Sequence, residues 1–137
     1  MIYRFKRDPK SGVIMVNLRI DDRHDFDMVL DTGASCTTID SNILYLNDCP
    51  FERKGFAKAE TANGAIKVEM VEVGSVSSLG IQKEKFPIQV YDFLSHGILT
   101  SYDGTLGLDF FEGTKFCIDM NEHTITLTSS RILNSAI

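Results

Sequence analysis

Residues 28–35 of this 137-residue chain read MVLDTGAS, and they are the most informative segment for its expected fold. An apolar run delivers the carboxylate of Asp31 and the hydroxyl of Thr32. Gly33 follows, and it permits a backbone turn that residues with a Cβ resist. We therefore expect a strand that ends in a tight turn, which holds Asp31 in a fixed place with its carboxylate bonded to nearby amide groups.

An ordinary strand-to-turn junction is the simpler alternative, because Asp and Gly are common in turns. Asp-Thr-Gly alone is expected by chance in about one or two per cent of chains of this length, so the bare motif is moderate evidence. The apolar residues before it, with Ala34 and Ser35 after it, sharpen the match by about an order of magnitude.

Alternating apolar and polar residues on both sides of this stretch predict further strands. Val16, Leu18 and Ile20 share one face of a period-two pattern, which is typical of a half-buried strand. The same reading applies to residues 26–30, 68–76, 85–93, 115–120 and 123–128.

Turns and helices complete the pattern. Lys83, Glu84 and Lys85 are interpreted as an exposed hairpin tip. Helix signals are confined to two short segments, residues 41–46 and 106–113. Closely spaced short strands with few helices predict a small β-barrel or sandwich.

Length, charge and composition narrow the class of protein. The hydrophobic content of 43% and the charged content of 24% are those of an ordinary soluble globular protein. The length suits one core, so residues 1–137 are expected to form a single domain. The net charge is -5 and no basic stripe is present, which argues against nucleic acid or an anionic membrane as a partner.

The termini and the cysteines indicate a cytoplasmic location. Residues 1–12 lack the apolar run of a signal peptide, and no stretch is apolar enough to span a membrane, although a domain excised from a longer chain would look the same. Cys36, Cys49 and Cys117 are sparse and have no CxxC spacing, so we expect neither a disulfide framework nor a zinc site.

No metal or other cofactor is expected. The three histidines, His24, His96 and His123, have no second ligand at metal-binding spacing. The acidic run from Asp21 to Asp27 lacks the spacing and the glycine of an EF-hand loop, and a solvated turn explains it better.

Residues 29–35, VLDTGAS, resemble the active-site signature of the aspartic peptidases. A single copy in a short chain resembles the retroviral-type members, the retropepsins, and their bacterial relatives. A second match is GTLGLDFF, residues 104–111, which corresponds to the segment that leads into a short helix in that family. Thr105 stands where the family more often has an aliphatic residue. The candidate residues of this second loop are Leu106, Gly107, Leu108 and Asp109.

A third, weaker match lies between the two motifs, where the family carries its flap hairpin. Asn-Gly is a strong hairpin signal, and any surface hairpin is the alternative. The candidate flap residues are Ala62, Asn63, Gly64 and Ala65. The resemblance covers about residues 13–127, and residues 47–55 have no counterpart in it.

The resemblance implies an all-β, small closed β-barrel with one short helix after the Gly107 segment, active as a homodimer. It implies an aspartic endopeptidase in which Asp31 of each subunit meets at a two-fold axis. One carboxylate takes a proton from water, and the other, protonated, donates a hydrogen bond to the scissile carbonyl. An extended peptide substrate would lie under the flaps, held by backbone hydrogen bonds and apolar pockets.

The resemblance also implies roles for the loop around Asp31. Thr32 would bond the partner subunit's loop, and the carbonyl of Gly33 would bond the substrate backbone. Ala34 has no hydroxyl to stabilise an ionised dyad, so activity is expected at mildly acidic to near-neutral pH. Retroviral enzymes often have Asp where this chain has Ser35, and Arg before the position of Asp109, so the dimer contacts must be built differently here.

An alternative is a dimeric peptide-binding or scaffolding module of the same fold that cuts weakly or not at all. A purely structural barrel is a third reading, which leaves the placed carboxylate unexplained. Residues 1–9 and 129–137 can each contribute strands to a dimer sheet, and the second segment reads equally as a disordered tail.

Overall fold

The computed structural model describes residues 1–61 and 64–129, and strands account for most of them. The strands are β1 (Ile2–Arg4), β2 (Lys6–Arg7), β3 (Ile14–Ile20), β4 (His24–Leu30), β5 (Thr38–Asp40), β6 (Glu52–Thr61), β7 (Gly64–Ser78), β8 (Ile81–Tyr91), β9 (Gly104–Leu106), β10 (Thr114–Asp119) and β11 (Thr124–Ser129). The all-β class predicted from the period-two patterns is confirmed.

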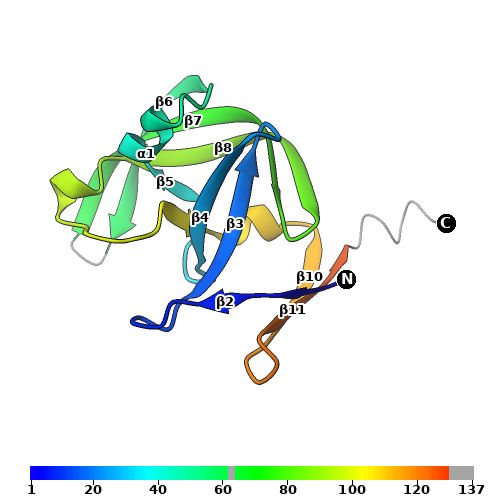
Figure 1. The fold of residues 1–137 in the computed structure, drawn as a ribbon. Coiled ribbons are helices and arrows are strands. Elements are labelled where there is room, and N and C mark those ends of the chain that lie inside the picture. The colour runs from blue at the N-terminus through cyan, green and yellow to red at the C-terminus, as the bar shows by residue number, and fades with distance from the viewer. Residues whose placement is uncertain (62–63, 130–137) are drawn as a thin grey trace.

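The larger sheet closes on itself. Its strand order is β2-β3-β4-β9-β5-β8-β7-β6, and β3 also pairs with β7 through Arg19–Ser77 and Ile20–Val76. Strands β3, β4, β9, β5, β8 and β7 therefore form a closed barrel, as predicted (Figure 1). Strand pairs β4–β9 and β5–β8 are parallel, whereas the other pairs of this sheet are antiparallel.

The helical segments are short. Residues Ser41–Leu46 form α1, and the Asp40 side chain caps it by accepting a hydrogen bond from the Asn42 amide. Residues Leu108–Phe111 form the 3-10 helix η2 directly after Gly107, so the predicted short helix is present as a single 3-10 turn. A second 3-10 turn, η1 (Leu94–His96), lies in the long connection between β8 and β9.

Buried hydrophobic side chains from the strands and from η2 form one core cluster. Leu18 and Ile20 on β3 are fully buried, as the alternation predicts. Phe110 of η2 is also fully buried and packs edge-to-face against Phe86 of β8, with ring centroids 5.9 Å apart. The helix that follows the second loop is thereby anchored in the core.

The terminal strands form a separate three-stranded sheet with the order β1-β11-β10 (Figure 1). The Leu127 amide donates to the Met1 carbonyl at 2.9 Å, and the Phe5 ring stacks on His123 at 5.5 Å. The N-terminal strand thus pairs with β11 of its own chain. Residues 130–137, which include most of the second predicted terminal segment, lie outside the described residues.

One turn assignment from the sequence is wrong. Lys83, Glu84 and Lys85 lie inside β8, and the β7–β8 turn is at Leu79–Gly80, where both residues have positive φ. The buried side chains Phe86 and Ile88 continue the alternation of β8, so the charged stretch is the exposed part of a paired strand.

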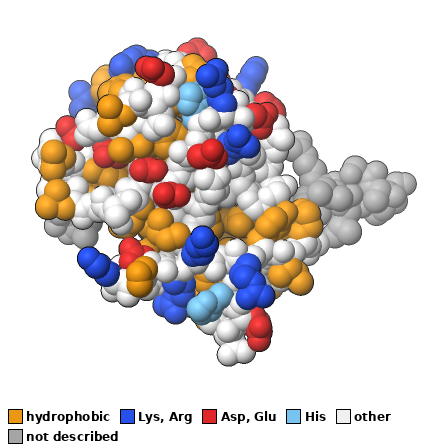
Figure 2. All heavy atoms as spheres, in the orientation of Figure 1, with side chains coloured by type: hydrophobic (Ala, Val, Ile, Leu, Met, Phe, Trp, Pro, Cys, Tyr) orange, Lys and Arg blue, Asp and Glu red, His pale blue; other side chains and the backbone are white. Residues whose placement is uncertain are grey.

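The surface is mixed in charge. On the face drawn in Figure 2, acidic and basic side chains are interspersed with hydrophobic ones. Among the described residues, no helix is long and apolar enough to cross a membrane.

Candidate active site

Asp31 stands at the end of β4, where three main-chain contacts fix its position. Its amide donates to the Leu106 carbonyl at 3.0 Å, and its carbonyl accepts from the Ala34 amide at 3.1 Å. Its carboxylate oxygen Oδ1 accepts from the Gly33 amide at 2.9 Å. The side chain is half-buried, so the strand end holds a carboxylate that still reaches solvent.

The second loop is joined to the first by backbone hydrogen bonds. Strand β9 runs parallel to β4, with Leu106 in register with Leu30. The Leu108 amide donates to the Ala34 carbonyl at 2.8 Å, and the Asp109 amide donates to the Ser35 carbonyl at 3.2 Å. The structure therefore brings both predicted loops together, although they are far apart in the sequence.

Gly107 sits where the two loops are closest. A Cβ built on Gly107 would lie 2.7 Å from the carbonyl carbon and oxygen of Cys36 and 2.8 Å from the carbonyl oxygen of Ala34. Because all three atoms belong to the backbone, no flexible side chain can move aside. Only glycine fits at this contact.

A buried network between Thr37 and Asp109 locks the junction. The Thr37 hydroxyl donates to Asp109 Oδ1 at 2.8 Å, and the Thr37 amide donates to Asp109 Oδ2 at 3.0 Å. The same hydroxyl accepts from the Gly107 amide at 3.1 Å. Thr37 is fully buried and Asp109 is half-buried, so these bonds are partly shielded from water.

Sequence reasoning named Asp109 but missed Thr37. The available signal was a threonine six positions after Asp31, within the same loop. A lone threonine in a turn is common, and nothing local indicates that its partner lies 72 residues away. In the structure, Asp109 binds the first loop of its own chain.

The outer side of the first loop is open. Thr32, Gly33 and Ser35 are exposed, and Ala34 is half-buried. Leu108, which follows the second loop's glycine, is 44% exposed. The backbone of these residues is fixed while this side remains free to contact a ligand or another chain.

Asp103, which directly precedes β9, links that strand to β4 and β5. Asp103 Oδ2 accepts from the Asp27 amide at 2.8 Å, the Asp103 amide donates to the Asp27 carbonyl at 2.8 Å, and the Asp103 carbonyl accepts from the Asp40 amide at 2.9 Å. Burial raises the pKa of Asp103 above its ordinary value, and the charges of Asp27 and Asp40 raise it further against the opposing amide bond.

The hairpin of β6 and β7 lies where the flap was predicted. The two strands pair as far as Thr61 and Gly64. Gly64 and Ala65 are the first residues of β7, and both are exposed. Ala62 and Asn63 lie outside the described residues. Gly64 has φ +107, a conformation that favours glycine.

The described residues include no group of three or more His, Cys, Asp or Glu side chains that could hold a metal ion. Cys36, Cys49 and Cys117 are free thiols. Burial raises the pKa of Cys49 to about 11, with a smaller contribution from the Asp21 charge.

Comparison with known proteins found a matching family model and similar solved structures. Residues 16–110 match a family model described as aspartyl protease. The crystal structure of a retropepsin-like aspartic protease from Rickettsia conorii is similar, with a TM-score of 0.62 and 20% sequence identity, over 93% of this chain and 89% of that chain. A search of curated proteins found no match. The barrel described above therefore has the retropepsin-like fold.

Proposed function

The chain belongs to the aspartyl protease family, and we propose that it is an endopeptidase that hydrolyses peptide bonds as a homodimer. The observation that carries this proposal is the fixed position of Asp31 in a loop whose outer side is open. In the described residues, the only side-chain hydrogen bond of Asp31 is to the Gly33 amide, so a second carboxylate must come from elsewhere.

A two-fold axis supplies the second carboxylate in this proposal. Two copies of Asp31 brought together would be too close to ionise at once, so they would share a proton. The ionised carboxylate takes a proton from the attacking water, and the protonated one donates a hydrogen bond to the scissile carbonyl. The two titrations would then belong to the pair and to neither residue alone.

The exposed loop residues have roles in the same arrangement. Thr32 is free to bond the loop of the partner subunit, and the Gly33 carbonyl is free to bond the substrate backbone. Ala34 uses its amide and carbonyl within the chain and has no hydroxyl to stabilise an ionised pair. We therefore expect activity at mildly acidic to near-neutral pH.

The substrate in this proposal is an extended peptide. The β6–β7 hairpin would act as the flap, and an extended chain beneath it would form sheet-like backbone hydrogen bonds. Such bonds do not depend on side-chain identity, so specificity would come from the side chains that line the cleft.

The test combines oligomeric state with cleavage. Sedimentation equilibrium at micromolar concentration should give about twice the chain mass of 15.3 kDa for both the wild type and Asp31→Asn. The rate of cleavage of a peptide library should fall by about a hundredfold to ten-thousandfold in Asp31→Asn. Asp25→Asn, an exposed change on the same strand, is the matched control and should leave cleavage unchanged.

Two outcomes would overturn the proposal. A wild-type chain that stays monomeric at high concentration and with a transition-state-type inhibitor would leave Asp31 without a partner. A dimer that binds peptides equally well before and after Asp31→Asn, without cutting them, would instead be the peptide-binding module considered above.

A further inference from the structure

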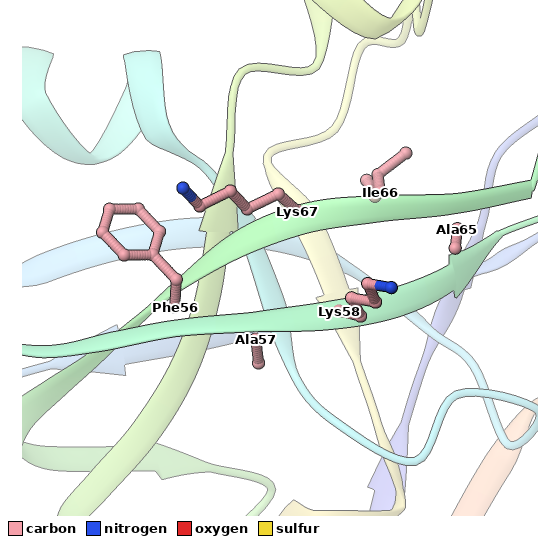
Figure 3. A pocket seen from close by; sticks show the side chains of 6 residues that line it. All are labelled: Phe56, Ala57, Lys58, Ala65, Ile66 and Lys67. Carbon is pink, nitrogen blue, oxygen red and sulfur yellow. The ribbon is translucent and has the colours of Figure 1, made fainter.

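The β6–β7 hairpin carries a hollow of about 450 Å³ close to its end. The residues that line it are Phe56, Ala57, Lys58, Ala65, Ile66 and Lys67 (Figure 3). Lys58 precedes Thr61 by three positions, and Lys67 follows Gly64 by three, so the hollow lies just behind the last paired residues of the hairpin. Nothing in the fold or in the arrangement around Asp31 requires two lysines at this place.

The two lysines are cross-strand partners in the hairpin. Lys58 on β6 is directly opposite Lys67 on β7 in the antiparallel register, so both side chains leave the same face of the hairpin. Like charges in this position destabilise a sheet. Figure 3 shows the Lys67 ammonium turned toward Phe56 and the Lys58 ammonium turned toward Ala65, so the two positive charges are spread along one face of the hairpin and together attract an anion.

The acidic residues nearby leave the two ammonium groups uncompensated. Glu69, on the same face, is bonded to Arg53. Glu60 lies two positions after Lys58 and is exposed, with no ion pair to either lysine. Among the described residues, neither Lys58 nor Lys67 forms an ion pair.

The hollow also offers apolar surface. The Lys67 ammonium lies 4.3 Å from the centroid of the Phe56 ring, which is 66% exposed. Such a cation–π contact holds the ammonium in place beside an apolar ring. Ala65, two positions before Lys67 and on the same face, adds further apolar lining. A carboxylate next to apolar groups is therefore complementary to the hollow.

We propose that this hollow binds an acidic side chain of the protein substrate, so that the enzyme prefers segments with Glu or Asp next to apolar residues. The inference rests on the proposed function, because the hairpin is then the flap that contacts the substrate. Each of the two ammonium groups can pair with one carboxylate. A chain of net charge -5 does not favour a long polyanion such as nucleic acid.

A binding experiment tests the site without requiring cleavage. Isotope-labelled Asp31→Asn protein is titrated with acetyl-Ala-Leu-Glu-Phe-Glu-Ala-amide and with the same peptide carrying Gln for Glu. The Glu peptide should bind about twofold to tenfold more tightly and shift the amide signals of the hollow. The difference should disappear in about 1 M salt, where charges are screened within about 3 Å.

Matched variants separate this site from general charge effects. The double variant Lys58→Gln/Lys67→Gln should bind both peptides equally. Lys54→Gln removes the same charge from the same strand outside the hollow, where Glu52 already pairs with it, and should leave the preference intact. Glu60→Gln removes the nearest uncommitted acid and should increase the preference.

The outcomes distinguish this inference from the proposed function. Equal binding of both peptides by the unmodified hollow, or a preference that survives the double lysine variant, overturns the inference. If Asp31-dependent cleavage is then still observed, the proposed function stands alone. If the Glu peptide maps to the hollow and the wild type cuts nothing, the acidic site stands and the endopeptidase proposal fails.

Discussion

The two loops at Asp31 and the β6–β7 hairpin are built in opposite ways. The loops are joined by backbone hydrogen bonds, a buried threonine and a glycine in direct contact with backbone atoms. Strand β6 is exposed over nearly its whole length, and among residues 1–61 and 64–129 it pairs with β7 alone, which leaves its other edge open. The loops are therefore held in one conformation by many contacts, whereas the hairpin is held by few.

In the proposed enzyme, this difference assigns two tasks to two regions of one small barrel. A reacting carboxylate must be held close to its working position, which requires buried, fully bonded support. A surface that meets varied substrates needs side chains that can adjust, and regions with few buried contacts open at low free-energy cost. If stability and activity follow this division, substitutions in the loops should cost more than substitutions in the hairpin.

The largest effect is expected from Gly107→Ala. The added methyl would meet three backbone atoms at 2.7–2.8 Å, so the loops must separate, at a cost of about 3 kcal/mol in the free energy of unfolding and with loss of cleavage. Gly55→Ala in the hairpin is the comparison. It has φ +121 but open space around it, and backbone strain alone should cost about 1–2 kcal/mol. Urea denaturation followed by circular dichroism measures both, and equal costs would break the contrast.

Removing the Asp109 carboxylate should have the next largest effect. Asp109→Ala leaves the buried Thr37 amide and hydroxyl without acceptors, which should cost about 2–3 kcal/mol of stability and reduce cleavage. Asp109→Asn keeps one acceptor and should cost less. Thr37→Ser keeps the hydroxyl and serves as the control in the same denaturation series. A neutral result for Asp109→Ala would mean that the network does not support the loop.

Asp103 should make a smaller, pH-dependent contribution beneath the active-site loops. Its raised pKa means that the folded chain binds this proton more tightly than the unfolded chain does. The stabilisation is present below the ordinary pKa near 3.8 and is lost as pH rises through the raised value.

The variant Asp103→Asn removes this charge but keeps an oxygen for the Asp27 amide. It should match the wild type near about pH 3 and be more stable at about pH 7, by less than about 1 kcal/mol. Urea unfolding midpoints of the wild type and the variant are measured across this pH range. A variant less stable than the wild type at neutral pH would contradict a raised pKa of Asp103.

The smallest effect is expected from Phe56→Ala in the hairpin. The ring is 66% exposed and its described contact is with the Lys67 ammonium, so the loss should be about 0.5 kcal/mol. Val68→Ala, on the same hairpin but with its side chain buried, should cost clearly more. If both substitutions lower the free energy of unfolding by the same amount in urea denaturation, side-chain exposure does not distinguish the two faces of the hairpin.

Much of the barrel could be predicted because its strands carry their own pattern. Leu18, Ile20, Phe86 and Ile88 alternate with polar residues, and alternation is a local property of the chain. Strand β6 could not be found in this way. Its sequence, ERKGFAKAET, has no apolar face to bury, and it forms a strand only because β7 pairs with it.

The turn that holds Asp31, the strand before it and the glycine of the second loop follow from local sequence, because each depends on a few neighbouring residues. Three other features arise only in the folded chain: Thr37 bonds Asp109, β3 closes the barrel on β7, and Lys58 pairs with Lys67 across the hairpin. These contacts depend on strand register and on chain closure over long separations. Alternative pairings of the same segments differ in energy only once the whole core is assembled.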